Sequence, residues 1–197
     1  MRVRTVAIDE ATGDVKGLYD DELASLGFVH NYTQLFSLHP AAYLSWGQLI
    51  TSIRGRMDLR RYELATLAAA AALRCRYCVS AHSNVVLERE FFSREEVEAL
   101  LRDYRAANLE PVDVAVMELA EKVALHAYRV TDEDFAGLRS LGLSDSDIFD
   151  VVLAAAARSF FSKTLDAMGC ESDIELTPTN DLIDVVPLPR VPTLSTS

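Results

Sequence analysis

Helix-breaking residues are scarce in most of this chain and gather at its C-terminal end. The sequence contains 6 prolines and 8 glycines among 197 residues, and four of the prolines follow residue 175. Proline interrupts a helix and glycine weakens it, so their scarcity favours helices through the body of the chain. We therefore expect a single all-α domain, a helical bundle, over residues 21–176, and the length of the chain also favours one domain.

Signals for helix starts occur throughout this region. Pro40 suits the first turn of a helix that runs to about Ile53, and Asp58 suits the N-cap of the next helix. That helix contains the alanine-rich run 68–72, and another helix is expected over residues 75–90. Further helix boundaries are marked by Ser93 with Glu96, Pro111, Thr131, Ser144 and Gly169.

The two ends of the chain differ from the body. Residues 1–20 alternate weakly and contain Gly13 and Gly17, which predicts an extended N-terminal arm with a turn. A short, irregular helix is expected next, between residues 22 and 37. Residues 177–197 contain four prolines and cannot be helical throughout. We expect them to form a tail that covers its own domain or a neighbouring subunit.

The alanine-rich runs suggest a degenerate internal repeat. A shift of 85 residues superposes residues 69–72 on 154–157, each within an apolar helix that has a polar start. In this register Cys75 is matched by Phe160 and His82 by Ala167. Such a repeat would duplicate the scaffold and keep the reactive residues in one copy.

Charge and composition argue against several classes of protein. The formal net charge of −11 repels a phosphate backbone, so no nucleic-acid partner is expected. The longest apolar stretch, residues 64–73, is about half the length of a membrane span, and no signal peptide is evident. Three cysteines do not make a secreted disulfide framework. We therefore expect a cytoplasmic protein without membrane association.

The residues best suited to chemistry lie close together in the sequence. Cys75 and Cys78 form a CxxC pair, His82 follows four residues after Cys78, and Glu63 precedes the pair by twelve residues. At a helix N-terminus such a pair can hold a thiolate and close a small disulfide ring. Residues four apart share a helix face, so His82 can accept the Cys78 proton, while Glu63 on the preceding helix can orient the imidazole.

This arrangement predicts a thiol redox cycle with a Glu63–His82–Cys78 proton relay. The Cys78 thiolate would attack a hydroperoxide to give a sulfenic acid. Cys75 would then condense with the sulfenic acid to form a disulfide and release water. The cycle requires no metal or organic cofactor, and none is expected.

Other interpretations of the same residues are open. The cysteines could be small buried hydrophobic residues, and Cys75, Cys78 and His82 could ligate zinc, although no second CxxC accompanies them. Glu63 alone could lie on a solvated helix face. The remaining candidates are expected in minor roles: His30 and His39 as packing or surface residues, His126 at a helix end, Tyr77 and Trp46 as walls, and Cys170 as an unpaired thiol.

The motif resembles that of the alkylhydroperoxidase D-like proteins of the carboxymuconolactone decarboxylase superfamily, most closely their peroxidase-related branch. The resemblance covers residues 30–170. It rests on Glu63, Cys75-x-x-Cys78 and His82, with Arg61-Tyr-Glu-Leu-Ala before them and Val130-Thr-Asp-Glu-Asp and Gly142-Leu-Ser-Asp after them. It implies an all-helical fold and assembly into dimers, trimers or hexamers. It also implies a cysteine pair in which Cys78 attacks and Cys75 resolves, with Glu63 and His82 as the relay.

One position departs from the family pattern. The well-studied branch has a second histidine directly before the second cysteine, where this chain has Tyr77. A phenol cannot exchange a proton near neutral pH as an imidazole does. The decarboxylase branch lacks the cysteine pair, so lactone decarboxylation is not expected.

Three functional hypotheses follow. The first is a thiol-dependent peroxidase or disulfide oxidoreductase that is reduced by a thiol donor, such as a lipoyl or thioredoxin-like protein. The second is a non-catalytic helical assembly protein whose cysteines sense redox state or only pack. The third is a lyase or isomerase that acts on a small carboxylate, with His82 and Glu63 as acid and base.

Overall fold

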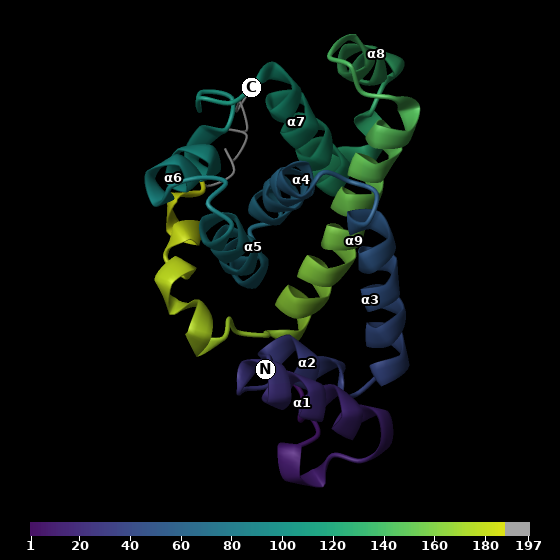
Figure 1. Ribbon diagram of the computed structural model, residues 1–197, viewed down its shortest axis with the longest axis vertical. Helices are drawn as coiled ribbons and strands as arrows, with labels where there is room; N and C mark the ends of the chain where they lie inside the picture. The colour runs from purple at the N-terminus through teal and green to yellow at the C-terminus, as the bar shows by residue number, and fades with distance from the viewer. Residues whose placement is uncertain (188–197) are drawn as a thin grey trace, which may run out of the picture.

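The computed structural model describes residues 1–187, which form nine α-helices joined by turns and four short 3-10 helices, without any strand in this range (Figure 1). The all-α expectation is confirmed. Within the described residues, none of the helices combines the length and the apolar character that crossing a membrane requires.

Helix α4 (Leu59–Ala72) lies at the centre of the molecule. It is surrounded by α5 (Arg76–Glu88), α7 (Pro111–His126) and α9 (Asp145–Met168), as Figure 1 shows. Every residue of α4 from Tyr62 to Ala70 is buried, and the small alanine side chains let the neighbouring helices approach closely. A polar residue on this helix, such as Glu63, is therefore placed in the core.

The remaining helices surround this centre. Helices α1 (Gly13–Leu26) and α2 (Asn31–Phe36) lie together beyond one end of α9, and α3 (Pro40–Arg54) runs beside α9 (Figure 1). Helix α6 (Arg94–Asp103) lies on the side of α5, and α8 (Asp132–Ser140) lies at the far end of α7 and α9. Together these helices enclose the α4–α5 hairpin that carries the candidate site.

The helix boundaries predicted from capping residues are confirmed. Asp58 accepts the backbone N–H of Arg61 at 3.0 Å, and Ser93 and Ser144 each form a capping box. Gly169 ends α9 with φ at 62°, a left-handed conformation that favours glycine. These signals act within a single helical turn, which explains why the sequence alone locates them.

The N-terminal segment is not the extended arm that the sequence predicts. Helix α1 begins at Gly13, and it ends before Gly27, so the irregular helix expected over residues 22–37 is the end of α1 followed by α2. The helix is held by a tertiary contact: Tyr19 is 1% exposed, and its hydroxyl donates to the Val6 carbonyl at 2.9 Å. Packing of this kind outweighs the low helix propensity of glycine.

The described part of the C-terminal tail packs on its own domain. Two 3-10 helices, Ile174–Thr179 and Leu182–Val185, run beside α5 and α6. Arg94 of α6 binds Asp181 at 2.6 Å, and Arg76 of α5 donates to the Asn180 carbonyl at 2.7 Å. This part of the tail therefore covers the domain itself, while residues 188–197 lie outside the described residues.

The degenerate repeat stays a prediction. Helices α4 and α9, which contain the two alanine-rich runs, pack against each other. Helix α4 ends just before a turn at Arg74, whereas α9 continues as one helix to Met168. The two halves therefore differ in the very segment that carries the cysteines.

Candidate functional site

The helix is interrupted between α4 and α5, and this turn places the two cysteines at the start of α5. Arg74 adopts a left-handed conformation with φ at 58°, and Cys75 follows as the extended N-cap of α5. The Cys75 carbonyl accepts the N–H of Val79 at 3.0 Å, which makes Cys78 the third residue of the helix. The positive end of the helix dipole and the unpaired N–H groups there favour a thiolate.

Both cysteines are buried free thiols. Cys75 is 0% exposed and Cys78 is 1% exposed, and they pack among apolar side chains such as Leu67 and Phe161. An apolar environment by itself disfavours a charged sulfur. The ionisation of these thiols therefore depends on the polar groups that accompany them.

The structure brings Glu63 and His82 together across the α4–α5 hairpin. Glu63 Oε2 lies 2.6 Å from His82 Nδ1, and their side chains are 2% and 13% exposed. Burial opposes ionisation of Glu63, yet the charge and the hydrogen bond of His82 keep the pKa of this carboxyl below its ordinary value. His82 is the more exposed of the two and lies nearer to the surface.

Arg158 also contacts the candidate site, and it is not among the residues predicted from the sequence. Its Nη1 donates to the Cys78 sulfur at 3.4 Å, and the residue is only 5% exposed. A signal was present in the sequence, because Ile148, Val151, Ala155 and Arg158 recur at helical spacing on the buried side of α9. A charged residue on an apolar stripe of this kind requires a buried partner.

The pKa values of the two thiols are shifted in opposite directions. Hydrogen bonding from the Cys75 thiol, and then the positive charge of Arg158, lower the pKa of Cys78 well below the ordinary value, against the effect of burial. The Ser162 hydroxyl and His82 act in the same direction. Hydrogen bonding to Cys78, together with burial, raises the pKa of Cys75. Cys78 therefore favours the thiolate and Cys75 the thiol.

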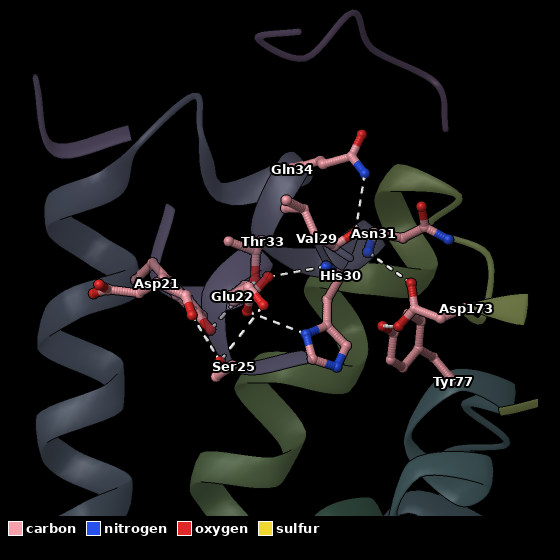
Figure 2. Close-up of polar contacts among 11 residues, drawn as sticks. Asp21, Glu22, Ser25, Val29, His30, Asn31, Thr33, Gln34, Tyr77 and Asp173 are labelled. Carbon is pink, nitrogen blue, oxygen red and sulfur yellow. Dashed lines mark hydrogen bonds and ion pairs between the residues drawn. The ribbon is translucent and has the colours of Figure 1, made fainter. Parts of the chain in front are cut away.

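Tyr77 is tied into a separate polar network, which Figure 2 shows. Its hydroxyl donates to the Asp173 carboxylate, which also accepts the backbone N–H of Asn31 at 2.7 Å. The Tyr77 ring packs edge-on against Tyr32 at a centroid distance of 5.6 Å. Burial, and then Asp173, raise the pKa of Tyr77, so its proton stays on the phenol. The contacts of Tyr77 are those of a packing residue that anchors residues near the end of α9.

The other candidates occupy the places expected of minor residues. His30 pairs with Glu22 at 3.1 Å, as Figure 2 also shows, and the ring of His39 caps α3 by accepting the Ala42 N–H at 3.2 Å. His126 is the last residue of α7. Trp46 stacks on Phe161 at 4.1 Å, and Cys170 is buried as a free thiol.

The geometry does not support a metal site. Among residues 1–187, no three His, Cys, Asp or Glu side chains are placed together so that they could hold a metal ion. Cys75, Cys78 and His82 belong to this range, so the structure does not arrange them as a zinc ligand set.

Part of the chain matches a known protein family. Residues 39–122, which include Glu63, Cys75, Cys78 and His82, match the carboxymuconolactone decarboxylase family. No curated protein matches the chain.

The fold is similar to that of several solved structures. One is an alkylhydroperoxidase AhpD core, a peroxidase-related protein from Ralstonia eutropha, with 21% identity, a TM-score of 0.79 and coverage of 91% of this chain and 95% of that one. Another is a peroxidase-related protein from Silicibacter, with 17% identity, a TM-score of 0.77 and coverage of 89% and 95%. A third is the debrominase Bmp8, with 17% identity, a TM-score of 0.73 and coverage of 91% and 96%. At these identities the likeness establishes the fold alone.

Proposed function

Since the chain belongs to the superfamily of alkylhydroperoxidase D-like and carboxymuconolactone decarboxylase proteins, we propose that it is a thiol-dependent peroxidase or disulfide oxidoreductase. The observation that carries the proposal is the asymmetry of the cysteine pair. Cys78 lies beside a buried guanidinium at 3.4 Å, and its pKa is lowered, while that of Cys75 is raised. A dithiol–disulfide cycle requires one cysteine that attacks as a thiolate and a second cysteine that stays protonated until it resolves the intermediate.

The first step is attack by the Cys78 thiolate on a hydroperoxide. The sulfur electron pair forms a bond to the terminal peroxide oxygen, and the oxygen–oxygen bond breaks. Cys78 becomes a sulfenic acid, and the other oxygen leaves as an alkoxide that needs a proton.

The Glu63–His82 pair handles that proton. Nδ1 of His82 bonds to Glu63 at 2.6 Å, so Nε2 is the ring nitrogen available for exchange. His82 can donate its proton to the leaving oxygen, and the Glu63 carboxylate stabilises the imidazolium before the transfer. Arg158 donates a hydrogen bond to the Cys78 sulfur at 3.4 Å and can stabilise the thiolate, so His82 need not be the group that deprotonates Cys78.

The second step joins the two sulfurs. Cys75 attacks the sulfur of the Cys78 sulfenic acid, a disulfide forms, and the oxygen leaves as water. A thiol reductant then restores the dithiol and is itself oxidised to a disulfide. We propose a lipoyl or thioredoxin-like protein for this role, and a homo-oligomer of the chain as the functional form. The catalytic unit would be the helical domain over residues 21–176.

A second candidate is reductive removal of a halogen by the same thiols. It is favoured by the likeness of the fold to the debrominase Bmp8, whose cysteine-to-alanine variant was solved with 2,3,4-tribromopyrrole. An aryl bromide and a dithiol would give the arene, bromide, a proton and the disulfide. This reaction would use the same Cys75 and Cys78 pair but a different oxidant.

The proposal is tested by turnover of an organic hydroperoxide with a panel of reductants: dithiothreitol, dihydrolipoamide and thioredoxin. We expect turnover with at least one of them, and its loss in Cys78→Ser and in Cys75→Ser. Turnover of a small carboxylate that survives both substitutions would instead identify a lyase or isomerase that uses His82 and Glu63. Consumption of bromopyrrole but not of hydroperoxide would favour the second candidate.

A further inference from the structure

Arg158 is a buried cation without a carboxylate partner among the described residues. Its Nη1 donates to the Cys78 sulfur at 3.4 Å, Tyr62 is a further hydrogen-bond partner, and its buried Nε has no partner among the described residues. A guanidinium removed from water is costly unless an anion compensates its charge. The Cys78 sulfur is the group in contact that can supply this anion.

Cys78 is the anion-forming group in direct contact with Arg158. From α4, Glu63 bonds to His82 at 2.6 Å and also feels the positive charges of Arg54 and Arg158, and Tyr62 is a hydrogen-bond partner of Arg158. From α9, Asp166 hydrogen-bonds with Cys75, and the Ser162 hydroxyl is neutral. From α5, Cys75 and His82 face Cys78, but only a protonated His82 would add positive charge. Arg158 is the permanent cation at this sulfur.

We propose that Arg158 is a further catalytic residue of the cysteine pair, and that it makes the Cys75–Cys78 disulfide readily reducible by stabilising the thiolate of the reduced state. The inference rests on the proposed dithiol–disulfide cycle and specifies the direction in which that cycle is biased.

Formation of the disulfide consumes the Cys78 thiolate and so removes the anion in contact with the buried Arg158 guanidinium. Reduction by two thiols of a reductant restores the thiolate, with a disulfide of the reductant as the other product. A disulfide whose reduced state is stabilised in this way is a stronger oxidant. The buried arginine therefore favours rapid return of the enzyme to its dithiol form.

The experiment compares Arg158→Met with the wild type in glutathione redox buffers. Methionine keeps the apolar bulk and removes the charge. We expect the equilibrium to shift towards the disulfide by about tenfold or more, and the Cys78 pKa to rise, because a shift of one pKa unit corresponds to a factor of ten. Arg158→Lys should retain part of the effect. Arg129→Met, which removes an exposed arginine after α7, is the matched control and should leave the equilibrium unchanged.

A second variant keeps the test decisive if Arg158→Met does not fold, as judged by circular dichroism. In Arg158→Gln, a neutral polar side chain replaces the guanidinium while the hydrogen bond from Cys75 to Cys78 stays in place. Ultraviolet thiolate absorbance should show a higher Cys78 pKa than in the wild type. An unchanged Cys78 pKa in a folded Arg158→Gln variant, or an unchanged glutathione equilibrium in a folded Arg158→Met variant, would overturn the proposal.

These readouts are independent of peroxide turnover. A chain that fails to turn over hydroperoxide but shows the shift in Arg158→Met would reject the peroxidase proposal and keep the role of Arg158. A chain that turns over hydroperoxide without the shift would keep the peroxidase proposal and reject this role.

Discussion

Glu63 Oε2 lies 2.6 Å from His82 Nδ1, which joins the two helices of the α4–α5 hairpin at a buried pair. The contact fixes the orientation of the imidazole and leaves its other nitrogen for proton exchange. Both residues come from the segment that the sequence analysis identified. The pair therefore offers the first point at which the proposed relay can be tested.

Replacement of Glu63 by Gln should slow the oxidation of Cys78. Glutamine keeps the shape and can still accept a hydrogen bond, but it no longer stabilises an imidazolium. Since proton transfer by a positioned group contributes about 100-fold or more, we expect a loss of at least about tenfold in the second-order rate with hydroperoxide. Stopped-flow measurement of thiol loss gives this rate. Glu95→Gln, on the exposed side of α6, is the control, and an equal rate in both variants would exclude Glu63 from the relay.

The same pair predicts a dependence of stability on pH. His82 lowers the pKa of Glu63 in the folded state, despite burial, so the folded protein favours the carboxylate more than the unfolded chain does. This contribution is fully present above the unfolded pKa of about 4.3 and is lost as the pH falls through the lower folded pKa. Urea unfolding of the wild type and Glu63→Gln should show a stability difference that shrinks below about pH 4. A difference that is constant with pH would contradict the assignment.

Tyr77→Phe should affect stability rather than chemistry. The substitution removes a buried hydroxyl that donates to Asp173 and leaves that carboxylate with one donor fewer. We expect a loss of about 1–3 kcal/mol in the free energy of unfolding. The rate of Cys78 oxidation should change by less than about twofold, since the phenol does not exchange a proton near neutral pH. A large fall in rate with unchanged stability would place Tyr77 in the reaction.

Cys170 should react more slowly than Cys78. Burial, and then Asp173, raise its pKa to about 12, whereas that of Cys78 is lowered. Because the thiolate is the nucleophile, limited alkylation at neutral pH should label Cys78 before Cys170. Mass spectrometry of the labelled peptides checks this order. Cys170→Ala should keep the reaction with hydroperoxide, and loss of that reaction would give Cys170 a part in the cycle.

The sequence predicts the parts of the fold that depend on local interactions. Ser93, Ser144 and Gly169 act within one turn of their own helices, so the boundaries of α6 and α9 follow from the chain itself. Helix α1 was missed because its stability comes from the burial of Tyr19 against the segment before it. Propensity alone could not reveal that contact.

The residues of the candidate site also differ in whether the sequence alone could predict them. Cys75, Cys78 and His82 belong to one short stretch, and Glu63 lies on the preceding helix, so spacing alone suggested their meeting. Arg158 is 80 residues from Cys78, and only the packing of α9 against the hairpin brings the two together. Long-range contacts of this kind depend on the tertiary arrangement, which a single sequence does not specify.

The most direct test of the account is titration of the thiols after one equivalent of hydroperoxide, followed by peptide mapping. The chain has three cysteines, all free in this structure. We expect two of them to be lost together, with Cys75 and Cys78 recovered as one disulfide-linked species and Cys170 still free. Three free thiols after the reaction, or a disulfide that includes Cys170, would contradict the proposed cycle.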